Sequence, residues 1–311
     1  MAQDTFSQVW NRVLLYAPGT PVALAQAFVK NTYKRCLDLH YWSELYKDSE
    51  YTTIAQFSTG TVAVTNGSAT ATLTTSLGNA TTYLGKQLRV GSYPPYYTIT
   101  AIDGTFKILT LDMAYPGVTA ATSTFVIGDF LVEFPSDLAV LDDIRDANNN
   151  WRLRRPFHQP NYLDFIDPRR VNTGYPILYV PAKSRVSVGV AYPRYEFWPR
   201  IPASTHLLYR YVANAELTAN ADYPITLLKP ETLVYGALSE LCLWPGTPER
   251  QNMYFNMDLH QKYTAMFDQS LQQSVLSDLD RSQRMLVYDD ASIGFPRDAN
   301  FIQAHGLAPT T

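Results

Sequence analysis

The segment from Tyr51 to Gly85 contains no Asp, Glu, Lys or Arg and is rich in threonine. It is too polar to cross a membrane and too poor in charge for a solvated linker. From Thr61 to Leu73 small apolar residues alternate with hydroxyl residues. A period of two is typical of a half-buried strand. The segment therefore predicts β structure in the middle of a chain whose two ends have helical patterns.

A β-hairpin is predicted at Asn66-Gly67, because both residues tolerate the positive φ of a type I′ turn. Folding the strands about this turn places Val64 opposite Ala69 and Val62 opposite Ala71, with the threonines on the other face. Further strands are predicted at "QLRVG", "YYTITAI", "FKILTLD", "STFVIG" and "FLVEFP". Short strands at this spacing predict a small antiparallel sandwich or barrel over residues 51–134.

Helical patterns precede this β segment. Thr5 and Gln8 have the spacing of a capping box, in which each side chain bonds the other's backbone N–H. Pro21 suits the first position of a second helix, where a missing N–H costs nothing. This helix is predicted to end near Tyr46.

Helical patterns return at Pro230, where apolar residues recur at helical spacing. Pro245-Gly246 ends this helix, and residues 247–249 (Thr-Pro-Glu) predict the cap of a last helix that runs to Arg281. Beyond residue 285 the periodicity is lost, which predicts an extended arm that folds onto a partner.

We therefore predict an α+β fold, in which N- and C-terminal helices form a helical bundle with an inserted small antiparallel β sandwich or barrel and an extended C-terminal arm. The predicted segments are the N-terminal bundle helices at 1–50, the β module at 51–134, a mixed strand and loop region at 135–228, the C-terminal helical hairpin at 229–284 and the arm at 285–311.

Composition favours a protein that covers much of its surface with other proteins. Charged residues make up 17% of the chain, below the roughly 25% usual for soluble domains, and there are 22 tyrosines. The net charge of −3 is unlike the strong basic excess of nucleic-acid binders. The N-terminus does not resemble a signal peptide, and no apolar run is long enough to span a membrane. Synthesis and assembly in a cytoplasm, with Cys36 and Cys242 as buried thiols, are expected.

The sequence offers no assignable catalytic or metal site. It has no phosphate-binding glycine loop with lysine, no zincin motif and no serine nucleophile elbow. The five histidines are scattered without metal-ligand spacing. We therefore expect no enzymatic activity, no cofactor and no metal.

A cluster of arginines is the one charged feature that suggests contact with a partner. Arg152, Arg154 and Arg155 lie close together, and Arg169-Arg170 follow. Such a cluster is either a solvated face held in local ion pairs or a surface that docks on an acidic protein or on DNA phosphates.

The order of motifs resembles a known family. "TGTVAVTNGSATATLTT", "GKQLRVG", "YYTITAI" and "KILTLDMAYPG" follow one another over residues 60–117 as in the β module of head-to-tail adaptor proteins of tailed bacteriophages. Residues 134–137 (Phe-Pro-Ser-Asp) resemble the return of that family's chain to its main body. Residues 244–246 (Trp-Pro-Gly) resemble the turn of its helical core.

The resemblance implies a structural virion protein in the neck of the particle. Adaptors form a ring, commonly of twelve copies, beneath the portal. They join it to the next tail component, a tail tube, nozzle or terminator protein, and leave a channel through which DNA passes without specific binding. The resemblance implies that the C-terminal arm inserts between portal subunits. Given such an adaptor, we predict that portal binding uses the arginine cluster and the apolar residues of the arm: Arg152, Arg154, Arg155, Phe295, Phe301 and Ile302.

Two other functions stay open at this point. A receptor-binding module of a tail fibre or spike would use Tyr93, Tyr96 and Tyr97 to stack on sugars. A tail-associated cell-wall hydrolase would need a pair of catalytic carboxylates, and the sequence identifies none.

Overall fold

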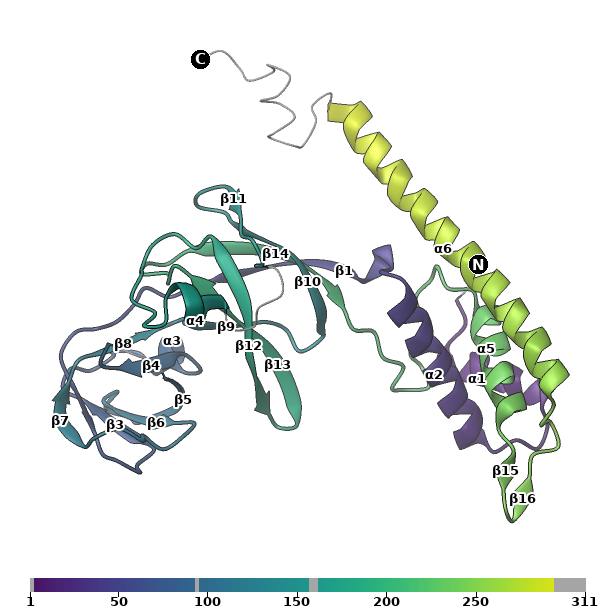
Figure 1. The fold of residues 1–311 in the computed structure, drawn as a ribbon, viewed down its shortest axis with the longest axis horizontal. Helices are drawn as coiled ribbons and strands as arrows, with labels where there is room; N and C mark the ends of the chain where they lie inside the picture. Colours follow the sequence, from purple (N-terminus) through teal and green to yellow (C-terminus); the bar gives the residue numbers. More distant parts are fainter. Residues whose placement is uncertain (1–2, 93–94, 157–161, 294–311) are drawn as a thin grey trace. The chain divides into compact units, whose positions relative to one another are not determined.

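A computed structural model describes residues 3–92, 95–156 and 162–293 of the chain (Figure 1). The chain divides into two compact units, each described by itself below. The helical unit combines residues 1–46 with residues 215–311, and the β unit comprises residues 47–214. The β unit is therefore inserted in sequence between the two halves of the helical unit.

The helical unit consists of four long helices and a short two-stranded ribbon. Its elements are α1 (Phe6–Tyr16), α2 (Val22–Leu39), the 3-10 helix η1 (Ser43–Leu45), α5 (Pro230–Leu243), the ribbon strands β15 (Gly246–Thr247) and β16 (Arg250–Gln251), and α6 (Met257–Ile293). The predicted capping box is confirmed, since Thr5 Oγ1 accepts from Gln8 N at 3.3 Å and Thr5 N donates to Gln8 Oε1 at 2.8 Å.

Helix α5 lies at the centre of this unit, and α1, α2 and α6 pack against it. Its buried residues lie on every side of the helix: Thr232, Leu233, Val234, Gly236, Ala237, Leu238, Ser239, Leu241 and Cys242. A helix that is apolar all round must be covered on several faces. By contrast α6 buries only a narrow stripe and extends well beyond α5 (Figure 1).

The β unit contains three larger sheets and two short helices. The seven-stranded sheet has the order β7 (Ala120–Ser123), β2 (Val62–Val64), β3 (Thr70–Leu73), β6 (Ile108–Leu111), β5 (Tyr96–Ile102), β4 (Gln87–Val90) and β8 (Phe125–Gly128). The four-stranded sheet has the order β1 (Tyr46–Thr52), β14 (His206–Ala213), β10 (Leu138–Asp146) and β11 (Trp151–Arg152). The three-stranded sheet has the order β12 (Leu178–Ser187), β13 (Val190–Trp198) and β9 (Leu131–Glu133). The helices are α3 (Ala80–Tyr83) and α4 (Tyr162–Ile166).

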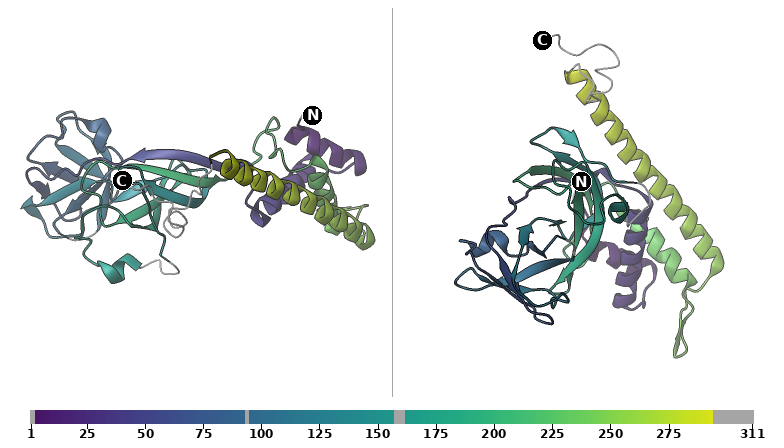
Figure 2. Two further views of the ribbon diagram at one scale, coloured as in Figure 1. Left: turned by 90° about the horizontal axis from the view of Figure 1, so that it is seen from above. Right: turned by 60° about the vertical axis from the view of Figure 1, so that its left-hand side comes forward.

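The seven-stranded sheet curls into a nearly closed barrel, seen from two further sides in Figure 2. The two ends of the strand order, β7 and β8, are consecutive in the chain. They do not pair with each other, so the barrel wall is open between them. The side chains that fill it include Val62, Val64, Leu73, Leu88, Tyr97, Ile99, Leu109, Phe125 and Ile127. Buried and more exposed residues alternate along β2 (Val-Ala-Val) and β3 (Thr-Ala-Thr-Leu) because one face is this core and the other faces solvent.

A second core lies between the other two sheets of the β unit. It joins Phe134, Leu141, Ile144, Tyr179, Tyr195, Phe197, Leu207 and Tyr209. Phe134 makes edge contacts with the rings of Tyr195 and Tyr209, at centroid distances of 5.2 and 4.7 Å. Many of the chain's tyrosines therefore serve this core and do not lie on the surface.

The predicted fold class is wrong. The chain is mostly sheet, and its terminal helices do not form the expected helical bundle. They share one unit, in which α1, α2 and α6 each pack mainly on α5. The second helix also ends at Leu39 and not near Tyr46, because Tyr46–Thr52 forms the edge strand β1. The charged residues of β1 suit a sheet edge, where they discourage further pairing.

Two other local predictions are wrong in detail. Val64 pairs with Ala71 and Val62 with Leu73, two residues from the predicted register. A shift of two preserves the faces, so the predicted apolar face is confirmed. Residues 247–249 do not cap the last helix but belong to the ribbon β15–β16, and α6 begins at Met257 and passes Arg281.

Gly236 allows three helices to meet closely, which gives a first prediction. A Cβ added there would lie 2.3 Å from Thr32 Cγ2 on α2 and 3.0 Å from Phe267 Cδ2 on α6. Alanine favours a helix over glycine by up to about 1 kcal/mol, but this clash outweighs that gain. We expect Gly236→Ala to lower the free energy of unfolding of the helical unit by about 1–3 kcal/mol. Denaturant unfolding followed by helical circular dichroism measures it.

The matched test is Thr32→Ala, which removes both side-chain atoms of Thr32 that crowd Gly236. In that background Gly236→Ala should cost less than in the wild type, because the helix preference of alanine then opposes only the 3.0 Å contact with Phe267 Cδ2. An increase in stability from Gly236→Ala with Thr32 intact would contradict the close approach described here.

Candidate functional site

The predicted arginine cluster lies on and after strand β11 of the β unit. Arg152 is on β11, directly opposite Arg145 on β10. Arg154 follows, and its backbone pairs with Leu178 at the start of β12. The side chains of Arg145 and Arg152 are each 65% exposed, and those of Arg154 and Arg155 are exposed as well. We call Arg145, Arg152, Arg154 and Arg155 the basic strip.

One carboxylate contacts the basic strip. Asp143 Oδ1 lies 2.5 Å from Arg152 Nε, and Asp143 Oδ2 lies 2.6 Å from Arg145 Nε. Within the described residues Arg154 and Arg155 form no ion pair. The ion-pair interpretation holds for Arg152, whereas docking on an acidic partner stays a prediction for Arg154 and Arg155.

Other residues named in the prediction have a different role or lie outside the described residues. Arg170 is buried in the β unit and bonded to Glu196 and Asp164, so it does not extend the basic strip. Phe295, Phe301 and Ile302 lie outside the described residues.

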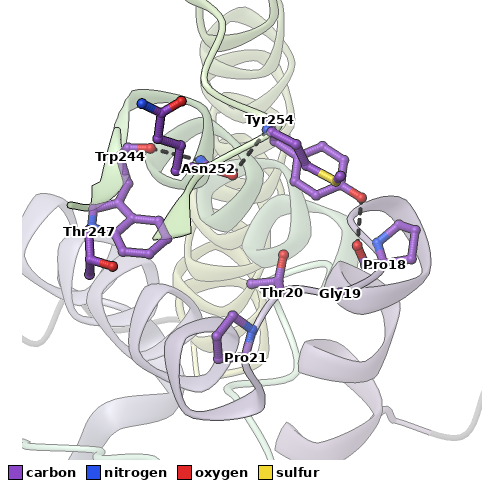
Figure 3. Close-up of a pocket in the computed structure, with 10 residues that line it drawn as sticks. Pro18, Gly19, Thr20, Pro21, Trp244, Thr247, Asn252 and Tyr254 are labelled. Carbon is purple, nitrogen blue, oxygen red and sulfur yellow. Dashed lines mark hydrogen bonds between the residues drawn. The ribbon is translucent and has the colours of Figure 1, made fainter. Parts of the chain in front are cut away.

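A pocket of about 260 Å³ lies in the helical unit, at the turn between α1 and α2 (Figure 3). Two segments far apart in the sequence line it: Pro18–Pro21, and the stretch 244–254 with Trp244, Thr247 and Gln251–Tyr254. Tyr254 Oη donates to Pro18 O at 2.7 Å and so joins the α1–α2 turn to the segment before α6. Asn252 Nδ2 donates to Leu241 O and Trp244 O at 2.8 and 2.7 Å. These bonds satisfy carbonyls that the end of α5 leaves without helical partners.

The lining of this pocket carries no charged side chain. Its polar groups are amides, hydroxyls and backbone, and its apolar groups come from two prolines, Trp244 and Met253. Its described lining holds no His, Cys, Asp, Glu, Lys or Arg side chain. It suits an uncharged, partly apolar group presented by another protein.

Several large apolar side chains in or next to the segments that line the pocket are exposed. Met253 is 81% exposed, and Leu15, Tyr16, Phe255 and Met257 are each more than half exposed. We call these five residues the apolar end of the helical unit. Scattered exposed apolar residues are ordinary, but a concentration beside a pocket is typical of a protein-binding surface.

Neither thiol is suited to nucleophilic chemistry. Cys36 and Cys242 are both buried and free. Burial raises the pKa of the Cys36 thiol to about 12 and also raises that of Cys242, so neither is a thiolate at neutral pH. Among residues 3–92, 95–156 and 162–293 no group of three or more His, Cys, Asp and Glu is placed to hold a metal ion.

Two of the three tyrosines considered for sugar stacking, Tyr96 and Tyr97, are turned into the protein. Tyr97 is only 2% exposed and belongs to the barrel core. Tyr96 stacks on Phe130 at a centroid distance of 4.8 Å, and its hydroxyl donates to Glu196 Oε1 at 3.3 Å. Tyr93 lies outside the described residues. Tyr96 and Tyr97 are therefore not available as a sugar-stacking platform.

Sequence reasoning missed the pocket and the apolar end. Trp244-Pro245-Gly246 marked a turn, but the meeting of this turn with Pro18–Pro21 depends on how α1, α2 and α5 pack. No helix in the described part of the chain is both long and apolar enough to span a bilayer. Comparison of the sequence with family models found no match, and no curated protein is significantly similar to it.

Proposed function

We propose that this chain is a structural virion protein of a tailed bacteriophage, a head-to-tail adaptor that assembles as a ring beneath the portal. In this role it joins the portal to the next tail component and surrounds the path of the DNA without binding it specifically. The order of motifs over residues 60–117 motivates the proposal, and within the structure these motifs belong to one nearly closed barrel.

The observation that carries the proposal is the apolar end with its uncharged pocket. A protein that acts alone gains nothing from exposing Leu15, Tyr16, Met253, Phe255 and Met257 together. A protein that is permanently assembled covers such residues, and obligate interfaces are rich in Met and aromatic side chains. The low charge of the chain has the same explanation.

The mass and shape of the assembled protein test this function. We expect a ring of about twelve copies, with a central channel, when the protein is mixed with the portal protein of the same phage. Light scattering measures the mass, and negative-stain electron microscopy shows the ring. A trimer would favour the fibre reading instead, and cleared bands in a cell-wall zymogram would favour a hydrolase.

Portal attachment is expected to depend on Arg154 and Arg155, the two residues of the basic strip that form no ion pair within the described residues. Reversing its charge with Arg154→Glu and Arg155→Glu should weaken capture by immobilised portal at least tenfold, because like charges then face an acidic partner. The effect should shrink at high salt, where exposed charges are screened. Phe295, Phe301 and Ile302 in the C-terminal arm are the other residues we assign to this contact.

The control is Lys34→Glu with Lys107→Glu, which changes the net charge equally at two other exposed positions. Portal capture should survive in this variant. An equal loss of portal capture in both variants would show that capture depends on the net charge of the protein and not on the position of the basic strip. Unimpaired capture of the Arg154 and Arg155 variant would remove the strip from the portal interface.

A further inference from the structure

The hairpin β12–β13 of the β unit ends in a turn that its own residues do not favour. Ser187 pairs with Val190, so Val188 and Gly189 form a two-residue turn with φ of +49° and +76°. Turns of this kind favour Asn-Gly or Gly-Gly, and a positive φ is strained for a β-branched residue such as valine. Val188 therefore costs stability in the isolated turn.

The same valine is fully exposed. Val188 is 101% exposed, Val186 on one side is 70% exposed, and Val190 on the other is 41% exposed. No charged residue occurs from Val186 to Ala191. In Figure 1 the end of the hairpin stands clear of the neighbouring strands of its unit. The strained backbone of Val188 and its exposed apolar side chain both lower the stability of the free protein. This cost indicates that the side chain contacts another molecule.

The pocket in the helical unit has an uncharged lining that suits the apolar tip of this hairpin. The pocket of the helical unit is uncharged, is lined in part by prolines, Trp244 and Met253, and measures about 260 Å³. A cavity of roughly 150 Å³ holds a benzene ring, so this one has room for a valine side chain and part of its turn.

The hairpin and the ribbon beside the pocket carry exposed side chains of opposite charge. Lys183, in the stem of the hairpin, is exposed and has no ion-pair partner in the described residues, whereas Arg185 and Arg194 both face Glu133. Exposed Glu249 stands between the two ribbon strands that flank the pocket. The exposed lysine on the stem and the exposed glutamate beside the pocket would attract each other across such a contact.

We propose that the tip of the β12–β13 hairpin, formed by Val186, Val188 and Val190, of one copy inserts into the pocket of the helical unit of a second copy. The contact joins two different surfaces of identical chains, so it is head-to-tail and generates a ring when the rotation closes. It deepens the proposed adaptor function, on which it rests, by naming the surfaces through which neighbouring subunits meet.

Val188→Asn separates the effect on assembly from the effect on folding. Asn-Gly is a preferred pair for this turn, so the variant should unfold at a temperature about 2–4 °C higher than the wild type. Its self-association, measured by analytical ultracentrifugation over a range of concentrations, should weaken at least tenfold. Met253→Asp, which places a charge in the pocket, should weaken self-association similarly.

A mixture of the two variants provides the decisive control. Each retains one intact surface, so together they should form a one-to-one dimer that does not grow further. Val188→Cys in one chain and Met253→Cys in another should form an intermolecular disulfide under oxidising conditions, because the native Cys36 and Cys242 are buried. Neither cysteine variant should form a disulfide with a copy of itself.

Three outcomes would overturn the inference. One is a ring or self-association unchanged by Val188→Asn, which would leave the adaptor function standing with another subunit contact. The second is growth of the variant mixture beyond a dimer. The third is the absence of both self-association and the disulfide at every concentration. Failure of the adaptor function itself is a separate result, in which the chains associate through these surfaces but form no ring and do not bind portal.

Discussion

Replacing Arg170 by alanine is expected to lower the free energy of unfolding of the β unit by about 3–5 kcal/mol. The guanidinium uses all three of its nitrogens. Nε donates to Glu196 Oε1 at 2.8 Å, Nη2 donates to Asp164 Oδ1 at 2.6 Å, and Nη1 donates to the carbonyls of Leu163 and Asp167 at 2.8 and 2.7 Å. Truncation leaves Glu196 buried without its cation, and an unpaired buried charge is costly.

The pH dependence of the stability lost in Arg170→Ala identifies the cause of that loss. Burial raises the pKa of Glu196, and Arg170 opposes that rise. Without Arg170 the folded-state pKa of Glu196 should rise further. A carboxyl whose folded pKa exceeds its unfolded value loses stability as pH rises between the two values. The deficit of Arg170→Ala relative to wild type should therefore be larger at pH 7 than at pH 5.

Glu196→Gln provides the matched rescue. Combined with Arg170→Ala it removes the uncompensated charge, so the double variant should be more stable at pH 7 than Arg170→Ala alone. Urea unfolding of the four chains at both pH values measures the coupling between the two residues. An equal deficit at pH 5 and pH 7 would show that lost packing, and not the buried carboxylate, causes the effect.

Replacing Asp278 by alanine is expected to destabilise the helical unit by about 2–4 kcal/mol. Asp278 is 2% exposed on the inner stripe of α6. Its Oδ2 lies 2.7 Å from His40 Nε2 and accepts from the backbone N–H of Ser43 at 3.1 Å. The carboxylate thus fixes the chain just after α2 ends. Asp268→Ala, at an exposed position on the same helix, should change stability by less than about 0.5 kcal/mol.

Acid should remove the contribution of Asp278. Burial raises its pKa, but hydrogen bonds from Ser43 and His40 lower it more, so the pKa of the folded state is below the ordinary value. Stability from a carboxyl with a lowered pKa is complete above the unfolded value of about 3.9 and is lost as pH falls through the folded value. The difference between wild type and Asp278→Ala should therefore narrow below about pH 4. A constant difference down to pH 2 would contradict this assignment.

Features decided by neighbouring residues were predictable from the sequence. The capping box at Thr5 and Gln8 and the alternating faces of β2 and β3 depend on local backbone bonds and on a period of two. The register of the hairpin was not predictable, because the loop around Tyr115 takes part in it. Gly67 N donates to Tyr115 O at 2.8 Å, and Tyr115 N donates to Ser68 O at 2.8 Å. A distant segment therefore sets the width of the turn.

The start of α6 illustrates a competition between two caps. Thr247-Pro248-Glu249 has a capping pattern, but Asn256 is the cap in the structure, because its Oδ1 accepts from the N–H groups of Asp258 and Leu259 at 2.8 and 3.1 Å. Capping patterns show where a helix is able to begin, and packing selects among them. Asn252, bonded to the end of α5, keeps the intervening residues in a ribbon.

The fold class was mistaken because helical periodicity is easier to see than strands in a mixed region. β10 and β14 carry charged residues among their apolar ones, and "RVSVGVAYP", interpreted as one strand, contains the turn at Val188-Gly189. The candidate surfaces were partly visible. Arg152, Arg154 and Arg155 of the basic strip could be named. Arg145 and Asp143 beside them, and the pocket between two distant segments, depend on tertiary packing.

The β unit is inserted between the two halves of the helical unit, so translation completes the β unit before it completes the helical unit. Residues 47–214 leave the ribosome as a whole before α5 and α6 exist, so the barrel and its neighbouring sheets are able to fold while α1 and α2 still lack the helix they pack on. The pocket and the apolar end both need residues from 241 onward. A truncated or stalled product therefore lacks them, and only a finished polypeptide presents the surfaces we assign to assembly.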